Sequence, residues 1–269
     1  MQTGKVIEYI VNWLIDYCEQ AQGKGFAVGV SGGIDSAVTS ALCARTGKTV
    51  YVLAMPIRTP PEQMKLAEDH ISWLKARYSD VCGVIQDLSP VFASMEENLS
   101  PQVQDGLTMA NTRSRLRMVT LYAYATHHRL LVAGTGNKVE DFGVGFFTKY
   151  GDGGVDISPI ADLMKSEVYE AGRQLGVIAG ILNAQPTDGL WADNRSDADQ
   201  IGASYDELEW AMRFLETPTD EARLTSRQRE VLSIYRRLHS ANRHKMEPIP
   251  VARIPKELRE GGWESPGAR

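Results

Sequence analysis

The sequence contains no apolar run of about 18 residues, the length that a helix needs to cross a bilayer. Its N-terminus also lacks the basic-then-apolar order of a secretory signal. Basic residues are in the minority, because 29 Lys and Arg stand against 34 Asp and Glu and give a net charge of −5. Affinity for nucleic acids and anionic membranes comes chiefly from clustered Lys and Arg, so we expect neither as a partner. These absences predict a soluble, cytoplasmic protein.

Cysteine is also scarce. Cys18, Cys43 and Cys82 are odd in number, far apart and surrounded by apolar residues. This arrangement argues against both a disulfide framework and a CxxC metal site. We expect three buried thiols.

The composition is that of a globular chain, with 43% hydrophobic and 23% charged residues among 269. This length suffices for one large α/β domain or two small ones. The sequence shows no internal repeat and no low-complexity linker, so we predict a single domain over residues 1–269. We expect the tail from about residue 251 to be ordered only in part.

Short apolar segments typical of buried strands alternate with segments of helical periodicity. This order, with short joints, predicts a Rossmann-like three-layer α/β/α fold with a mainly parallel sheet. Ligands of such sheets bind beyond the carboxyl ends of the strands. The glycine-rich segment 143–154 and the acidic segment 188–200 are expected to cover that site. The predicted strands are 26–30, 50–55, 82–88 and 130–133. The main predicted helices are an amphipathic leading helix from residue 3 to about 18, and then 35–45, 61–78, 104–128, 165–175, 204–215 and 226–242.

The first predicted strand is followed by the turn Ser31-Gly32-Gly33-Ile34-Asp35-Ser36, which opens a helix. The two glycines let the backbone turn without side-chain obstruction, so N–H groups at the helix start can face phosphate oxygens. The two serines can donate further hydrogen bonds. The Gly-Lys-Ser/Thr ending of a Walker A loop is absent. The loop therefore binds phosphate in another way, and its one carboxylate needs an explanation.

The SGGIDS turn, placed between a strand and a helix, resembles the PP-loop of the ATP pyrophosphatases, which cleave ATP between its α and β phosphates. The resemblance implies that Asp35 binds Mg²⁺, which lies between the carboxylate and the pyrophosphate. Mg²⁺ often binds through one or two carboxylates together with substrate phosphates. The resemblance also implies ATP contacts at Gly29, Val30, Ser31, Gly32, Gly33, Ile34, Asp35 and Ser36.

Two further segments, 134–140 and 146–154, resemble the ammonia-dependent NAD synthetases. Shorter matches in the order of that family extend from about residue 5 to residue 250. The resemblance implies ATP-dependent amidation of deamido-NAD by ammonia. The nicotinate carboxylate first attacks the α-phosphate of ATP, and ammonia then displaces AMP from the acyl adenylate. The products are NAD, AMP and pyrophosphate.

The resemblance assigns roles to residues outside the PP-loop. Lys165 matches a catalytic lysine that offsets charge on the leaving pyrophosphate, and a lysine at a helix start is otherwise unfavourable beside the helix dipole. Glu140 matches the second metal-binding acid, although alone it would pass as a charge at a helix N-terminus. Thr135 and Thr187 match ATP contacts, although each alone would pass as a turn or cap residue.

A second group of residues matches positions that bind deamido-NAD in the family. Positively charged side chains at these positions can pair with the phosphates of the dinucleotide. An acidic side chain can accept hydrogen bonds from ribose hydroxyls or lie beside the positively charged pyridinium. Arg113, Arg115 and Arg117 alternate along one predicted helix and cannot share a face. Of the three, the resemblance assigns a deamido-NAD contact to Arg115, and its two neighbours are taken as solvated or paired. The group comprises Arg115, Lys149, Asp156, His244 and Lys245.

The second step needs neutral ammonia, which is mostly ammonium near pH 7. A nearby acid that binds ammonium and accepts its proton would help. Asp152 is our hypothesis for this catalytic acid. The alternative is that Asp152 only shapes a glycine turn.

Glutamine-dependent relatives carry an additional amidase domain, for which 269 residues leave no room, so free ammonia is the expected donor. The family resemblance also implies a homodimer with the dinucleotide site at the subunit interface. Two alternatives remain. One is another PP-loop enzyme, either the ATPase subunit of an amidotransferase or a tRNA-modifying ligase. A tRNA-modifying ligase would be expected to show a basic face or catalytic cysteines, and neither is evident. A noncatalytic adenine-nucleotide sensor is the other, and it would bind ATP without releasing pyrophosphate.

Overall fold

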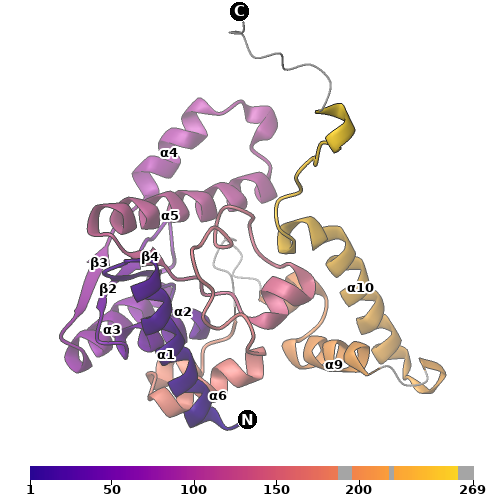
Figure 1. The fold of residues 1–269 in the computed structure, drawn as a ribbon, viewed down its shortest axis with the longest axis horizontal. Coiled ribbons are helices and arrows are strands. Elements are labelled where there is room, and N and C mark those ends of the chain that lie inside the picture. The colour runs from indigo at the N-terminus through magenta and orange to yellow at the C-terminus, as the bar shows by residue number, and fades with distance from the viewer. Residues whose placement is uncertain (187–195, 218–220, 260–269) are drawn as a thin grey trace, which may run out of the picture.

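The computed structural model describes residues 1–186, 196–217 and 221–259, and Figure 1 shows its fold. The centre is a sheet of four parallel strands in the order β3-β2-β1-β4. Chain order is therefore not spatial order, since β4 pairs with β1. This arrangement confirms the predicted parallel α/β fold. The strands are β1 (Gly25–Gly29), β2 (Thr49–Ala54), β3 (Val81–Ile85) and β4 (Leu131–Val132).

Helices cover both faces of this sheet because its strands are apolar on both sides. In β1, Phe26 and Val28 point into the core shared with the helices of one face. Ala27, between them, packs on the other face with Ala125 of α5. The first face carries α1 (Thr3–Gln20), α2 (Ile34–Ala44), α3 (Pro61–Arg77) and α6 (Lys165–Leu175), and the second carries α5 (Gly106–His128).

A second apolar cluster lies away from the sheet. It joins the π-helical turn η2 (Val139–Val144) to α9 (Tyr205–Glu216) and α10 (Ser226–Met246), the two helices drawn in orange in Figure 1. Leu208 and Leu232 are among its buried members. The cluster fixes η2, which carries Glu140, against helices far along the chain. The remaining elements are α4 (Ser89–Asn98), η1 (Pro101–Val103), α7 (Ala179–Leu182), α8 (Asp197–Ile201), η3 (Glu221–Arg223) and η4 (Lys256–Leu258).

Two details differ from the expectations. Cys18 and Cys43 are buried, but Cys82 is exposed, because it lies on β3 at the edge of the sheet. The short helices α7 and α8 were not predicted, and neither was α4. Only Phe92 of its ten residues is buried, so the segment carries little helical periodicity. Within the described part of the chain, no helix is long and apolar enough to cross a membrane.

His70 links two helices in the core and makes the stability depend on pH. It is 1% exposed, and its Nε2 atom lies 2.8 Å from the Ser40 hydroxyl of α2. Burial lowers the pKa of His70 to about 4. The unfolded chain takes up this proton near pH 6.5 and the folded chain only near pH 4, so the free energy of unfolding falls as the pH drops between these values. Over the whole window this amounts to about 3 kcal/mol.

The His70→Gln variant removes this titration. Between pH 7 and pH 4.5, both proteins should lose stability. We expect the free energy of unfolding of the variant to decrease less than that of the unsubstituted chain, by about 2 kcal/mol. Urea unfolding at both pH values measures the difference. Equal acid sensitivity of the two proteins would show that His70 is not the group responsible.

Candidate functional site

The PP-loop lies between β1 and α2, at the carboxyl edge of the sheet. Gly32 has φ +87, and a Cβ there would lie 2.8 Å from the Gln63 carbonyl oxygen, so only glycine fits. The Ser36 hydroxyl donates to the Gly33 carbonyl at 2.9 Å and accepts from the Ser31 N–H at 3.2 Å. Gly33 is the N-cap of α2 and has no side chain that would occupy the N–H groups of the first turn. These groups can therefore bind an anion.

A cavity of about 460 Å³ opens at this loop. It is lined by residues 29–36 together with Thr135, Glu140, Asp152 and Lys165. The structure thus brings together the described residues that were predicted to bind ATP or metal or to catalyse. Thr187, the one further member of that set, lies outside the described residues.

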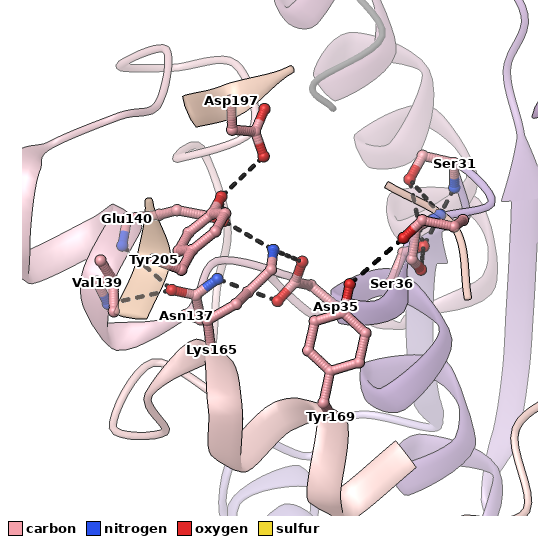
Figure 2. A network of polar contacts seen from close by, with 12 residues as sticks. Ser31, Asp35, Ser36, Asn137, Val139, Glu140, Lys165, Tyr169, Asp197 and Tyr205 are labelled. Carbon is pink, nitrogen blue, oxygen red and sulfur yellow. Dashed lines mark hydrogen bonds and ion pairs between the residues drawn. The ribbon is translucent and has the colours of Figure 1, made fainter. Parts of the chain in front are cut away.

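Lys165 is at the centre of the site, between the two predicted metal acids (Figure 2). Its Nζ atom lies 2.6 Å from Asp35 Oδ2 and 3.0 Å from Glu140 Oε1, and the residue is 3% exposed. Burial alone would lower the pKa of Lys165, but the charges of both carboxylates and their hydrogen bonds raise it above its usual value. Lys165 is therefore charged at neutral pH.

Glu140 is also largely withdrawn from solvent. Burial raises the pKa of Glu140 to about 6, although the positive charge of Lys165 acts in the opposite direction. The Tyr205 hydroxyl, from the start of α9, donates to Glu140 Oε1 at 2.5 Å. The same hydroxyl lies 2.8 Å from Asp197 Oδ2, at the start of α8.

Asn137 connects the two acids from a fully buried position. Its Nδ2 atom donates to Asp35 Oδ1 at 3.0 Å. Its Oδ1 atom accepts from the backbone N–H groups of Val139 and Glu140, at 3.1 and 3.2 Å. Asn137 thus sets the orientation of the Asp35 carboxylate relative to the η2 backbone (Figure 2).

The charges of the residues around the cavity indicate whether it could hold a metal ion. Among the described residues that line it, five carry a carboxylate and only Arg117 and Lys165 carry a positive charge. This excess of negative charge disfavours a triphosphate unless further positive charge binds with it. Asp35 and Glu140 already hold one cationic group between them, and carboxylate oxygens are the ligands that Mg²⁺ prefers. The residues therefore fit a divalent cation. The five acids are Asp35, Glu62, Glu140, Asp152 and Asp197.

Asp152 has a structural role. Its Oδ1 atom accepts hydrogen bonds from the Ser114 hydroxyl at 2.7 Å and from the Thr148 N–H at 2.9 Å. These contacts tie the glycine-rich turn to α5. The residue also lines the cavity, so the ammonium role stays a prediction beside the structural one.

The predicted deamido-NAD residues do not line this cavity. Four of them come together where α10 ends. Lys149 Nζ donates to the His244 carbonyl at 2.6 Å, and Arg115 donates to the Lys149 carbonyl at 3.4 Å. Lys245, whose pKa is lowered by burial, donates to the carbonyls of Gly145 and Phe147.

Asp156 lies apart from these four residues. Its two carboxylate oxygens accept hydrogen bonds from the Tyr122 hydroxyl at 3.0 Å and from the Val132 N–H at 2.8 Å. Asp156 therefore joins α5 to the end of β4, and its predicted contact with the dinucleotide stays a prediction.

Sequence reasoning gave no role to three residues of the site. Asn137 was included only as part of the matching segment 134–140, Tyr205 was not singled out, and Arg117 was left as solvated or paired. In the structure Arg117 lines the cavity and donates to the Met55 carbonyl at 3.0 Å. No local signal marks the contacts of Arg117 with Met55, of Asn137 with Asp35 and of Tyr205 with Glu140, because these partners lie at least 62 residues apart along the chain.

The family model for NAD synthase matches residues 6–249. The NH(3)-dependent NAD(+) synthetase of Archaeoglobus fulgidus is 36% identical over 258 residues, which cover 94% of this chain and 98% of that protein. The enzyme of the same name from Mesoplasma florum is 36% identical over 212 residues, with 78% and 84% coverage.

A solved structure of an NMN synthetase from Francisella tularensis superposes with a TM-score of 0.84 at 30% identity, covering 94% of this chain and all of that one. The residues matched by the family model include the PP-loop, Glu140 and Lys165, and the family agrees with the resemblance stated from the motifs. Because the family model spans residues 6–249 and relatives align over nearly their whole length, the chain belongs to the NAD synthase family.

Proposed function

We propose that this chain is a ligase that amidates the nicotinate carboxylate of deamido-NAD with ammonia, at the expense of ATP. The observation that carries the proposal is the convergence of Asp35, Glu140 and Lys165 at the end of a PP-loop, in one cavity. A noncatalytic nucleotide sensor would not need a buried lysine between two acids. The identity of the curated relatives also favours the synthetase.

In the first step an oxygen of the nicotinate carboxylate attacks the α-phosphorus of ATP. The bond from this phosphorus to the bridging oxygen breaks, and pyrophosphate leaves with the electron pair. The first-turn N–H groups of α2 and the hydroxyls of Ser31 and Ser36 bind the phosphates. Lys165 supplies positive charge where negative charge develops on the leaving group. Thr135 lines the cavity beside them and Thr187 is proposed as a second ATP contact.

Asp35 and Glu140 would hold Mg²⁺ between them and the phosphates. When bound, the cation neutralises charge on the triphosphate and polarises its oxygens. Asn137 keeps the Asp35 carboxylate turned toward the cavity. The acids therefore attract the nucleotide only together with its metal.

In the second step ammonia attacks the acyl carbon of the adenylate. The bond to the AMP oxygen breaks, AMP leaves, and the new amide loses one proton. We assign the binding of ammonium and the acceptance of its proton to Asp152, whose carboxylate lines the cavity. Arg115, Lys149, Asp156, His244 and Lys245 are the proposed contacts of the dinucleotide.

The Asp152→Asn variant tests the ammonium role. Asn keeps an oxygen that accepts from Ser114 and Thr148, so the turn should stay in place. We expect the KM for ammonium to rise and kcat to fall by about 10²-fold, with pyrophosphate release from the first step retained. Steady-state rates at several ammonium concentrations and pH values measure both. An unchanged ammonium dependence and pH profile would leave Asp152 with its structural role only.

The substrate itself needs a direct assay, because one solved relative is an NMN synthetase. The purified chain is incubated with ATP, Mg²⁺ and ammonium, and with either deamido-NAD or nicotinate mononucleotide. We expect a higher kcat/KM for deamido-NAD. The reverse preference would make the protein an NMN synthetase by the same chemistry, and pyrophosphate release with neither substrate would contradict the amidation.

The nitrogen donor is tested in the same reaction. We expect NAD, AMP and pyrophosphate in equal amounts with ammonium, and no NAD with glutamine under ammonia-free conditions. Equal yields from glutamine would overturn the donor assignment.

We further propose a cytoplasmic homodimer, since ATP and deamido-NAD are cytoplasmic metabolites. The homodimer is what the resemblance to the NAD synthase family implies. Light scattering coupled to size exclusion tests the dimer. A monomer at micromolar concentration would contradict it.

A further inference from the structure

The hydroxyl of Tyr205 lies against the second predicted metal acid. It reaches Glu140 Oε1 at 2.5 Å and Asp197 Oδ2 at 2.8 Å (Figure 2). A phenol carries one hydrogen, so the two carboxylates share this donor. The tyrosine ring also lies beside Lys165, with 4.5 Å between Nζ and the ring centroid. Tyr205 thus contacts three charged side chains that line the cavity.

The backbone at Tyr205 is held firmly. Tyr205 is the first residue of α9, and Ser204 caps that helix by accepting from the Glu207 N–H. The Glu207 carboxylate in turn accepts from the Ser204 N–H at 2.9 Å and pairs with Arg227 of α10 at 2.7 Å. Because the start of α9 is capped and ion-paired to α10, the backbone from which the Tyr205 side chain extends is held in place.

Tyr205 and Lys165 contact the same oxygen of Glu140. Lys165 is a flexible side chain, and its ammonium is the group assigned to the leaving pyrophosphate. Tyr205 has only two side-chain torsions to fix and no such second task. The tyrosine is therefore the contact that can keep Glu140 oriented while the lysine serves the substrate.

We infer that Tyr205 is a positioning residue that orients Glu140 toward the metal, and that Asp197 holds the Tyr205 hydroxyl in place. The inference rests on the proposed function, because it takes Glu140 as a metal ligand. It requires no contact between Tyr205 and a substrate. Loss of a partner that orients a metal ligand typically weakens metal binding by about 10- to 100-fold.

The test is Mn²⁺ binding to the full chain and to Tyr205→Phe, which keeps the ring beside Lys165. The protein is mixed with a smaller amount of a non-hydrolysable ATP analogue, and Mn²⁺ is added in steps. Electron paramagnetic resonance measures the concentration of free Mn²⁺ after each addition. We expect the Kd for Mn²⁺ to rise about 10-fold in Tyr205→Phe. The Mg²⁺ concentration for half-maximal pyrophosphate release should rise in parallel, with a smaller loss of kcat at saturating Mg²⁺.

Two variants make the outcome specific. Tyr169→Phe also removes a tyrosine hydroxyl at the cavity, one that contacts the Ala184 carbonyl at 3.5 Å, and it should leave the Kd for Mn²⁺ unchanged. Glu140→Gln should abolish binding at this site. If Glu140→Gln abolishes binding but Tyr205→Phe stays within twofold of the unsubstituted chain, the inference about Tyr205 is wrong. If Glu140→Gln binds normally, the metal assignment itself fails, and the inference fails with it.

A double-mutant cycle tests the part of Asp197. If Asp197 acts through the tyrosine, Asp197→Asn should weaken Mn²⁺ binding in the unsubstituted chain and add little in Tyr205→Phe. Full additivity of the two changes would overturn the link between Asp197 and Tyr205. Thermal unfolding of each variant confirms that the chain is folded.

Discussion

Asp35→Ala is expected to abolish pyrophosphate release in the presence of deamido-NAD. Asp35 is the acid of the PP-loop, and a cation at a transferring phosphoryl group stabilises its transition state by several kcal/mol. A loss of about 4 kcal/mol corresponds to a decrease of about 10³-fold in kcat/KM. Single-turnover release of pyrophosphate measures this step without the contribution of ammonia.

Asp35→Asn is the matched control for shape. It keeps the volume of the side chain near Asn137 and removes the negative charge. We expect a loss of similar size, because the charge rather than the packing binds the cation. Normal pyrophosphate release by either variant would contradict the role of Asp35. Thermal unfolding should show a folded protein in both cases, since Lys165 keeps Glu140 as a partner.

Lys165→Met is expected to have the second largest effect, on stability as well as on activity. Without the ammonium, the carboxylates of Asp35 and Glu140 face each other with side-chain exposures of only 17% and 16%. Breaking a buried ion pair on one side typically costs about 3 to 5 kcal/mol. We expect a decrease of that size in the free energy of unfolding in EDTA. Addition of Mg²⁺ should stabilise the variant more than the unsubstituted chain, because the cation offers the two acids a new partner.

Lys48→Met is the matched control for losing a lysine ion pair. Lys48 Nζ lies 2.8 Å from Glu19 Oε1 at the surface, and such pairs contribute at most about 1 kcal/mol. Urea unfolding of both variants with and without Mg²⁺ measures the comparison. Equal stabilities of Lys165→Met and Lys48→Met in EDTA would show that the buried triad does not support the fold.

The sequence predicted the elements of the site better than its contacts. The PP-loop follows from its glycines and its place between a strand and a helix, and Lys165 was predicted as the first residue of a helix that begins there in the structure. These features are local, so periodicity and turn chemistry reveal them. The parallel sheet follows from the alternation of strands and helices.

The contacts that orient the acids depend on tertiary structure. Asn137 meets Asp35 across 102 residues, and Tyr205 meets Glu140 across 65. Neither spacing has a local pattern that indicates a contact. The exposure of Cys82 also depends on strand order, since an apolar segment gives no sign that its strand lies at the edge of the sheet.

The most direct test of the proposed metal and phosphate site is a crystal structure of the chain with a non-hydrolysable ATP analogue and Mn²⁺. The anomalous signal of Mn²⁺ identifies the ion. We expect the triphosphate at the N–H groups of the PP-loop, and the ion in contact with both the Asp35 carboxylate and the phosphates. We also expect Lys165 Nζ to be turned from its position between Asp35 and Glu140 toward the phosphates. An ion bound elsewhere, or a triphosphate away from this loop with Lys165 still between the acids, would contradict the proposed site.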